Sequence, residues 1–133
     1  MIFGIGIDIA KCSRFEKWLQ KPEMLERFFN AKEFSKTDAA ADLTEAQKSA
    51  LLQHYAARFA AKEAFSKALG SGLVFDLRDV YVEKQENGRP LLSVQSSALE
   101  ALKNYCPQWE GAKIFVSLSH EKEYAAAQVV IEI

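Results

Sequence analysis

One run near the middle of the chain is Arg58-Phe59-Ala60-Ala61-Lys62-Glu63-Ala64-Phe65-Ser66-Lys67-Ala68-Leu69-Gly70. Ala, Lys, Glu and Leu favour a helix, and a glycine after such a run is typical of a helix C-terminus. At 100° per residue the alanines gather on one side, at positions 57, 60, 61, 64 and 68. The polar side chains occupy the opposite half: Arg58, Lys62, Glu63, Ser66 and Lys67. The run therefore predicts the last turns of a helix whose small-residue side lets another element pack closely.

The charged half of this run has two interpretations. The first is an ordinary solvated helix face, in which Glu63 and Lys67 form an i,i+4 pair that contributes about 0.2–0.5 kcal/mol. The second is a site for a polyanion, in which the cations bind phosphate and the carboxylate binds the metal ion that bridges phosphates. Helix statistics favour the first, so the second needs support from elsewhere in the chain.

The start of the same helix is marked by Thr44-Glu45-Ala46-Gln47. Gln47 stands at the third helical position after Thr44, which is the pattern of a capping box. We therefore expect one helix from Glu45 to Leu69. A helix of this length is unusual in a globular protein, and we expect it to be the spine of the domain.

Composition limits the kind of protein. The chain has 133 residues, 49% of them hydrophobic, which is typical of one folded domain spanning residues 1–133. The net charge of −1 argues against a general nucleic-acid binder. Cys12 and Cys106 are too few for a disulfide framework and are expected to be free thiols. With neither a signal peptide nor a membrane-spanning apolar run visible, a cytoplasmic enzyme or binding domain is expected.

The chain begins with a strand pattern over residues 2 to 9. Side chains alternate along a strand, so one face is apolar and is expected to be core. That face consists of Phe3, Ile5, Ile7 and Ile9. The opposite face consists of Ile2, Gly4, Gly6 and Asp8. Because glycine within a strand often marks the close approach of a ligand or another backbone, Asp8 is either a ligand or a cap for the next helix.

Residues 13 to 43 predict short helices. Ser13 is a candidate cap for a helix that starts near Arg14, and Pro22 interrupts the pattern before a second helix. A short helix from Ala31 to Lys36 and a loop through Ala41 follow. Four cations stand among the apolar residues of the first two helices: Arg14, Lys17, Lys21 and Arg27. They form either an ordinary helix surface or a docking surface for an acidic partner.

The last half of the chain alternates between strand and helix patterns. Val80 to Val82 and Pro90 to Val94 flank Asn87-Gly88, a strong hairpin signal. Ser97-Ala98-Leu99-Glu100 is a capping-box pattern for a helix to about Tyr105. Strands are expected over Lys113 to Ser119 and Tyr124 to Ile133, the latter buried on both faces because both are apolar. These patterns predict an α+β fold with a mainly antiparallel sheet packed on the long central helix.

His120 follows the first of these two strands. It is either a turn residue with a locally bonded ring or a group that contacts phosphate and transfers protons near pH 7. The sequence has no GxSxG elbow, no P-loop and no zinc-ligand spacing. Serine-hydrolase, P-loop and zinc chemistry are therefore not indicated.

Three separated motifs coincide in this chain: Gly4-Ile5-Gly6-Ile7-Asp8-Ile9, the run from Arg58 to Ala68, and Ser117-Leu118-Ser119-His120 followed by Glu121-Lys122-Glu123-Tyr124-Ala125. In this order they resemble the holo-[acyl-carrier-protein] synthases, the small bacterial-type class of 4′-phosphopantetheinyl transferases. The resemblance covers essentially the whole chain. Asn87-Gly88-Arg89-Pro90 is also similar to the NGKP-type turn of the family, with Arg89 in place of the more usual Lys. Segment 30–53 departs from the family, with Asn30-Ala31-Lys32-Glu33 where a Leu-Thr-x-x-Glu run is common.

The resemblance implies the 4′-phosphopantetheinyl transferase fold and a reaction. The phosphopantetheine arm of coenzyme A moves to a serine of an apo acyl carrier protein, and 3′,5′-ADP is released. Mg²⁺ and a homotrimer with each active site at a subunit boundary are also implied. Other functions left open are a non-catalytic carrier-binding module with a decayed site and a nucleotide-binding domain of different chemistry.

The resemblance also implies roles for individual residues. The metal carboxylates fall on Asp8 and Glu63, and Lys67 joins them as the catalytic group that neutralises the transferring phosphate. Glu63, acting through a metal-bound water, is the candidate base for the carrier serine. The coenzyme contacts fall on Arg58, Lys62, Ser66, Lys67, Gly70, Pro90 and His120. The carrier protein would dock on Arg14, Lys17, Lys21 and Arg27.

Overall fold

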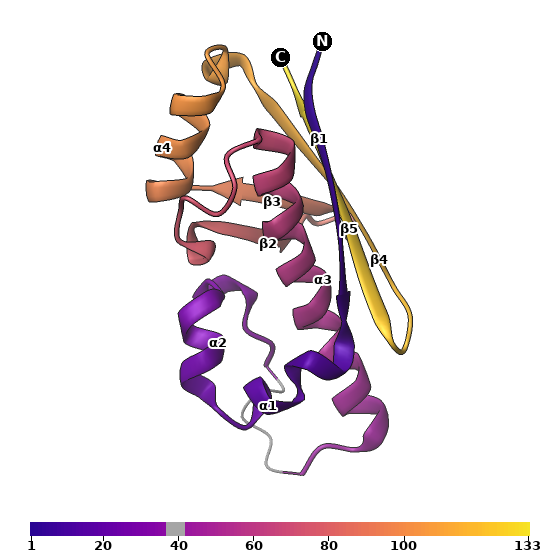
Figure 1. The fold of residues 1–133 in the computed structure, drawn as a ribbon. Coiled ribbons are helices and arrows are strands. Elements are labelled where there is room, and N and C mark those ends of the chain that lie inside the picture. Colours follow the sequence, from indigo (N-terminus) through magenta and orange to yellow (C-terminus); the bar gives the residue numbers. More distant parts are fainter. Residues whose placement is uncertain (37–41) are drawn as a thin grey trace.

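The computed structural model describes residues 1–36 and 42–133 (Figure 1). The strands are β1 (Ile2–Lys11), β2 (Val80–Lys84), β3 (Pro90–Val94), β4 (Lys113–His120) and β5 (Tyr124–Glu132). The α-helices are α1 (Glu16–Leu19), α2 (Pro22–Phe28), α3 (Glu45–Leu69) and α4 (Ser96–Tyr105). Short 3-10 turns occupy Cys12–Phe15, Ala31–Glu33, Leu77–Asp79 and Trp109–Gly111. The predicted α+β class with antiparallel strands on a long helix is confirmed, while part of the expected loop through Ala41 lies outside the described residues.

Helix α3 begins and ends where the sequence predicts. Thr44 N donates to Gln47 Oε1 over 2.9 Å, and Gln47 N donates to Thr44 Oγ1 over 3.1 Å, which completes the capping box. At the other end Gly70 has a φ of 76° and its N–H bonds to the carbonyls of Ser66 and Lys67. Because glycine adopts this left-handed conformation easily, the helix stops there.

The two glycines of β1 let this strand approach the backbone of α3. A Cβ on Gly4 would lie 1.9 Å from the carbonyl oxygen of Ala68, and one on Gly6 would lie 1.9 Å from that of Ala64. Any larger residue would therefore push the helix away from the strand. The close approach expected from the glycines is confirmed, and its partner is the small-residue side of α3.

The isoleucine face of β1 points away from the helix. Ile5, Ile7 and Ile9 are 54%, 63% and 65% exposed, so the prediction that they form the core is wrong. The physical reason is that α3 contacts the backbone of β1 directly, and only a face without bulky side chains permits such a contact. The buried side of β1 is therefore the glycine side, which also carries Asp8.

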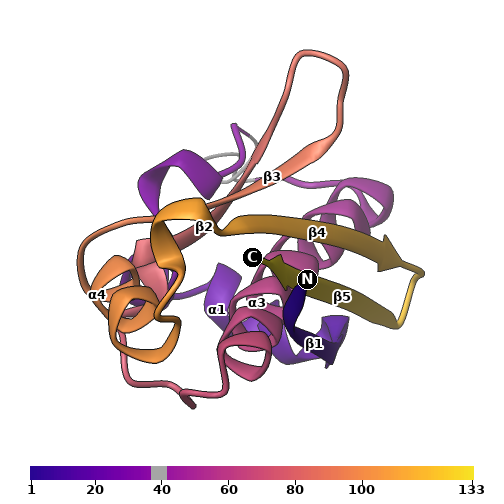
Figure 2. The same ribbon diagram turned by 90° about the horizontal axis from the view of Figure 1, so that it is seen from above.

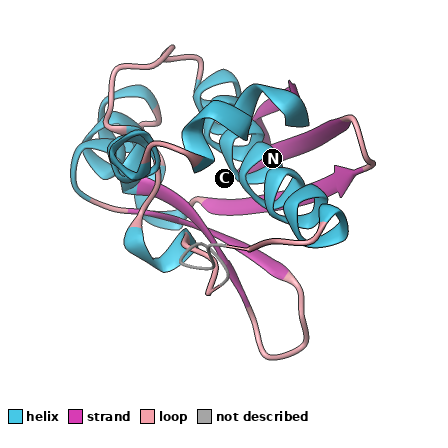
Figure 3. Ribbon diagram, turned by 90° about the horizontal axis from the view of Figure 1, so that it is seen from below, coloured by secondary structure: helices cyan, strands magenta, loops and turns pink. Residues whose placement is uncertain are grey.

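The strands form two separate groups. β1, β5 and β4 make a three-stranded antiparallel sheet in that order, and α3 lies against one face of it (Figure 1). β2 and β3 make a two-stranded ribbon whose turn projects away from the body of the molecule (Figures 2 and 3). The predicted turn at Asn87-Gly88 is confirmed, with Gly88 at a φ of 81°.

Helix α4 forms as expected, but the predicted capping box does not. Its N-cap is Gln95, which makes no side-chain cap. The hydroxyl of Ser97 instead donates to Asp79 Oδ2 over 2.5 Å and accepts from Asp76 N over 2.9 Å. The Ser97 side chain therefore joins α4 to the turn before β2.

The N-terminal helices cover the far end of α3 (Figure 1). The first begins as a 3-10 turn without a side-chain cap, so Ser13 does not have its predicted role. The second begins at Pro22, as expected. Phe15 and Trp18 pack on Phe59 of α3 with ring centroids 5.5 and 5.7 Å apart, which fixes this end of the chain to the helix.

The face of the three-stranded sheet that points away from α3 carries a group of apolar side chains. We call this group the outer sheet face; its members are Ile5, Ile7, Ile9, Phe115 and Val130. Gln128 and Ser117 lie on the same face in the row of Ile7. The register places Ile5, Val130 and Phe115 side by side across the three strands. The predicted burial of β5 on both faces holds for one face only, since Ala127 and Val129 are buried whereas Val130 is partly exposed.

The cysteines and the helices agree with two further expectations. Cys12 and Cys106 are free and buried. Burial raises the pKa of the Cys12 thiol, because the thiolate would lose hydration. In the part of the chain that the structure describes, no helix combines the length and the apolar character needed to cross a membrane.

Candidate active site

Asp8, Glu63 and Lys67 gather where β1 crosses α3, and we call them the carboxylate cluster. Lys67 Nζ donates to Asp8 Oδ1 over 2.9 Å and to the carbonyl oxygen of Ile7 over 3.1 Å. Lys67 therefore pairs with Asp8, not with Glu63 as the solvated-face interpretation requires. The side chain of Asp8 is 19% exposed and that of Lys67 is 53% exposed, so a substrate can reach both.

The two carboxylates of the cluster repel each other. Burial raises the pKa of Glu63 above the usual carboxyl range and the charge of Asp8 raises it further, whereas Lys67 and Arg14 lower it. A bound cation would relieve this repulsion. The described residues hold no group of three or more His, Cys, Asp or Glu side chains that could bind a metal alone. Two neighbouring carboxylates are a donor set that suits Mg²⁺, which takes one or two protein carboxylates and completes its shell with phosphate oxygens and water.

A groove of about 390 Å³ lies between α3, the β2–β3 hairpin and the end of β4, and we call it the hairpin groove. Its walls are Ala50, Gln53, His54, Ala57, Arg58, Val82, Lys84, Gly88, Pro90, Leu118 and His120. Three residues predicted to contact a coenzyme line it: Arg58, Pro90 and His120. Asp8, Glu63 and Lys67 do not line it, so one chain carries the predicted site residues in two separate places.

Arg58 gives the hairpin groove a buried positive charge. Arg58 is only 8% exposed, and its Nη1 donates to the carbonyl oxygen of His54 over 3.3 Å. Among the described residues, Nε has no hydrogen-bond partner. Burial lowers the pKa of the guanidinium, but arginine stays charged in proteins. A guanidinium charge in the wall of this groove favours an anion there.

His54 lies one helical turn before Arg58 and is neutral at pH 7. Its Nε2 is 2.6 Å from the carbonyl oxygen of Glu33, and since a carbonyl only accepts, Nε2 carries the proton. Burial, together with the charge of Arg58, lowers the pKa of His54 to about 4. The ring therefore ties α3 to residue 33 without adding charge to the groove.

We expect His54→Gln to reduce the loss of stability between pH 7 and pH 4.5. The unfolded chain protonates this histidine below about pH 6.5 and the folded chain only near pH 4, so acid favours the unfolded state in that window, by about 2–3 kcal/mol. Gln keeps a donor for Glu33 but does not titrate. Urea unfolding of both proteins at the two pH values measures the difference, and an identical loss in both would contradict the neutral state of His54.

Lys62 and Ser66 do not share a solvated face with Glu63. Lys62 has no exposed surface, and Ser66 is 3% exposed with its hydroxyl donating to the carbonyl oxygen of Glu63 over 2.7 Å. The solvated-face interpretation is therefore wrong for both residues. Lys62 is buried because Glu33 and the edge of β2 cover its ammonium group. Both side chains are buried in this structure, and the coenzyme contacts predicted for them stay predictions. Gly70 caps the end of α3 and does not line the hairpin groove.

A model of the 4′-phosphopantetheinyl transferase superfamily matches residues 4–129. The chain belongs to this superfamily. Among similar proteins, the holo-[acyl-carrier-protein] synthase of Treponema denticola is 48% identical over 137 residues, which cover 99% of each chain. The holo-[acyl-carrier-protein] synthase of Bacillus subtilis is 38% identical over 135 residues, covering 99% of this chain and 97% of that one. Within the superfamily, this transferase is therefore a member of the holo-[acyl-carrier-protein] synthase family.

Solved structures agree with this assignment. A holo-(acyl-carrier-protein) synthase from Bacillus anthracis in complex with CoA (3′,5′-ADP) has a TM-score of 0.71 at 35% identity, covering 98% of this chain and 96% of that chain. The Neisseria meningitidis synthase has a TM-score of 0.77 at 26% identity, covering both chains completely. The transferase fold predicted from the sequence is thereby confirmed.

The four predicted docking cations of this transferase are exposed on the helical end formed by residues 12–28. We call Arg14, Lys17, Lys21 and Arg27 the basic patch. The guanidinium of Arg14 lies 4.7 Å from the ring centroid of Phe59, and that of Arg27 lies 5.5 Å from that of Phe28. The charge of Arg14 also lowers the pKa of Glu63, so this member of the basic patch acts electrostatically on the carboxylate cluster.

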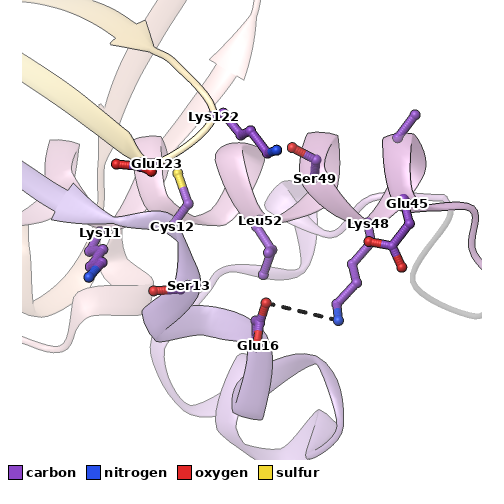
Figure 4. A pocket seen from close by; sticks show the side chains of 11 residues that line it. Lys11, Cys12, Ser13, Glu16, Glu45, Lys48, Ser49, Leu52, Lys122 and Glu123 are labelled. Atoms are coloured by element: carbon purple, nitrogen blue, oxygen red, sulfur yellow. Dashed lines mark ion pairs between the residues drawn. The ribbon is translucent and has the colours of Figure 1, made fainter.

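A second, larger cavity of about 570 Å³ lies at the beginning of α3 (Figure 4). Lys122 reaches over it from the β4–β5 connection toward Ser49, and an ion pair between Glu16 and Lys48 at 3.9 Å crosses one side. Its charged side chains balance, with three lysines and three glutamates. It contains none of the site residues predicted from the sequence, so we place no catalytic step there.

Several residues of these sites are not predicted from the sequence. His54 is one turn from Arg58 on the predicted helix, so helical periodicity could have found it. Lys84 ends β2, three residues before the predicted turn at Asn87, and has only that position as a signal. The contact of Glu33 with Lys62 joins residues 29 positions apart, and no local pattern predicts it.

Proposed function

We propose that this transferase moves the 4′-phosphopantetheine arm of coenzyme A to a serine of an apo acyl carrier protein. In this proposal, 3′,5′-ADP is the second product and Mg²⁺ is required. The observation that carries the proposal is the carboxylate cluster, in a chain whose relatives along 99% of its length are holo-[acyl-carrier-protein] synthases. The protein would act in the cytoplasm, where it would supply active carriers for fatty acid biosynthesis.

The chemistry of the cluster suits phosphoryl transfer. Asp8 and Glu63 would hold Mg²⁺, which when bound polarises the phosphate oxygens of the coenzyme. Lys67, already 2.9 Å from Asp8, would place its charge beside the transferring phosphate. Glu63, acting through a metal-bound water, is the candidate base for the serine hydroxyl. Catalysis of this kind rests mainly on positioning and charge neutralisation.

The hairpin groove would receive the nucleotide end of coenzyme A. Arg58 on α3 offers its guanidinium charge, and His120 at the end of β4 lines the same groove. Pro90 adds an apolar wall that suits a base or ribose. The name of the Bacillus anthracis structure includes CoA (3′,5′-ADP), which supports a nucleotide site in a protein of this fold.

We further propose that the protein is a homotrimer with each active site at a subunit boundary. Asp8 lies on β1 and His120 on β4, the two edges of the three-stranded sheet, with β5 between them. Strands are about 4.8 Å apart, so the two edges of one sheet are separated by roughly 10 Å. Contact between the β1 edge of one subunit and the β4 edge of the next would bring the two sets of residues together. The exposed outer sheet face gives such an assembly an apolar surface to bury.

Incubation with coenzyme A, Mg²⁺ and apo acyl carrier protein tests the reaction. Mass spectrometry should show the carrier gaining one phosphopantetheine group, and chromatography should show 3′,5′-ADP in equal amount. A carrier-binding module would bind the carrier without changing its mass, and a nucleotide-binding domain of other chemistry would bind coenzyme A alone. No mass gain, with both substrates bound, would reject the proposed transfer.

Reversal of charge in the basic patch should weaken carrier binding. Acyl carrier proteins are acidic, so Arg14→Glu/Lys21→Glu should slow association and raise the carrier KM about 10-fold at low salt, and less at high salt. The affinity for coenzyme A should change little. Steady-state kinetics across a salt series measures both. Charge reversal on α4, as in Lys103→Glu, is the matched control, and carrier kinetics that respond equally to both variants would place the docking surface elsewhere.

A further inference from the structure

One edge of β2 has no neighbouring strand among the described residues. β2 pairs only with β3, and the bonds from Gln95 N to Asp79 O and from Gln85 N to Arg89 O fix which residues face that partner. Because neighbouring residues of an antiparallel strand point their N–H and C=O groups to opposite edges, the groups of Val80 and Val82 point away from β3. Both residues are at most 1% exposed, so these backbone groups need partners inside the protein.

Lys62 and Glu33 supply those partners. Lys62 Nζ donates to the carbonyl oxygen of Val80 over 2.5 Å, and Glu33 Oε2 accepts from Val82 N over 3.1 Å. The two side chains also bond each other over 2.5 Å, and neither has more than 1% exposure. The ion pair therefore binds the free edge of β2 much as a neighbouring strand would.

Both members of the pair are themselves fixed. Lys62 uses its third donor on the carbonyl oxygen of Leu77 over 3.0 Å, and Glu33 Oε1 accepts a second bond from Asn30 N over 3.1 Å. The carbonyl oxygen of Glu33 is held by His54 of α3. The pair thus joins α3, β2 and the 3-10 turn Ala31–Glu33 at one point. An apolar pair of similar size would fill the space and leave several backbone groups without partners.

The Glu33–Lys62 pair lies beside the hairpin groove. Lys62 is one helical turn from Arg58 on α3. Val82, which Glu33 binds, is two residues from Lys84 on β2, and both line the groove. The pair therefore links the two walls that face each other across the groove. We propose that Glu33 and Lys62 are a positioning pair, which holds the β2–β3 hairpin at a fixed distance from Arg58 and so shapes the groove for coenzyme A. This inference rests on the proposed function of the groove.

The double variant Glu33→Met/Lys62→Met tests the pair. Single variants would leave one buried charge unpaired and are expected to be unstable, whereas removal of both charges keeps the volume and avoids that penalty. We expect the Kd and KM for coenzyme A to rise at least about 10-fold while kcat stays within about 3-fold, because the carboxylate cluster lies elsewhere. Amide exchange should also speed up at Val82, which loses its acceptor, more than at Tyr81, which faces β3.

The matched control is Lys32→Met/Glu83→Met. This exposed ion pair, 3.2 Å long, joins the same segment to the same strand, and its loss should leave the KM for coenzyme A within about 2-fold. An unchanged KM in a folded Glu33→Met/Lys62→Met protein would overturn the inference, as would an equal rise in the control.

If the double variant does not fold, a second variant tests the same inference. Glu33→Asp keeps the negative charge beside Lys62 but is one methylene shorter, so it cannot bond both Lys62 and Val82 N as Glu33 does, and its KM should rise in the same direction. An unchanged KM in folded Glu33→Asp would overturn the inference. Absence of transfer by the wild-type protein would reject the proposed function, and direct binding of coenzyme A would still report on the groove.

Discussion

Transfer activity is expected to fall at least about 100-fold in Asp8→Asn and in Glu63→Gln. Each substitution keeps the size of the side chain and removes one negative charge, so Mg²⁺ would retain only one protein carboxylate. Loss of that charge weakens metal binding and leaves the developing charge on the phosphate poorly neutralised. Carrier modification, measured by mass across a series of Mg²⁺ concentrations, gives the rate and the metal requirement of each variant.

Both variants should remain folded. The ion pair of Asp8 with Lys67 is exposed on the lysine side, and pairs of this kind contribute about 0–1 kcal/mol to stability. The charge of Glu63 contributes to stability with the opposite sign. Because the pKa of Glu63 is raised in the folded protein, its charged form destabilises the fold at neutral pH, and the neutral Gln should not lower stability. Glu100→Gln, at an exposed pair on α4, is the control that removes a carboxylate far from the cluster. Near-normal turnover at Asp8→Asn or Glu63→Gln would remove that residue from the metal site.

The sequence predicts those elements whose signals are local. Thr44 and Gln47 mark the start of α3 within four residues, and Gly70 marks its end by a backbone conformation that glycine adopts easily. Asn87-Gly88 places the hairpin in the same way. These signals need no knowledge of distant parts of the chain, and each is confirmed.

The burial of whole faces depends on partners that the sequence does not place. The alternation in β1 indicates two faces correctly, but the choice of the buried face depends on α3, whose backbone admits glycine and not isoleucine. Lys62 has the pattern of an exposed helix residue, and it is buried because Glu33 and the edge of β2 bond all its donors. A charged residue inside the protein is stable only with such partners, and these come from distant positions.

For the candidate site, too, the contacts between distant residues are not predicted by local patterns. Asp8 and Lys67 stand 59 positions apart, and the resemblance to a family, not any local pattern, points to their proximity. Arg58 and Lys67 belong to one predicted charged face, yet the structure assigns them to the hairpin groove and to the carboxylate cluster. Helical periodicity cannot separate these two environments, because the separation is made by β1 on one side of α3 and by β2 on the other.

Two inactive variants are expected to restore activity to each other if the site is shared between subunits. Asp8→Asn disables the carboxylate cluster, and His120→Ala disables the hairpin groove. In a mixed trimer, a boundary formed by the cluster of one subunit and the groove of its neighbour can combine two intact halves. Random exchange of equal amounts should make about a quarter of the boundaries intact, so about a quarter of wild-type activity should return.

The matched control mixes Asp8→Asn with Lys67→Ala, two lesions in the same half of the site. No boundary in that mixture contains an intact cluster, so activity should stay at the level of the separate variants. Sedimentation should show a mass of three chains at the assay concentration, and exchange is verified independently of activity when an affinity-tagged variant co-purifies with its untagged partner after mixing. A fully active monomer would contradict both the trimer and the shared site. If Asp8→Asn and His120→Ala do not complement each other after verified exchange, both halves of each site lie in one subunit. The carboxylate cluster and the hairpin groove would then act from opposite sides of the same α3.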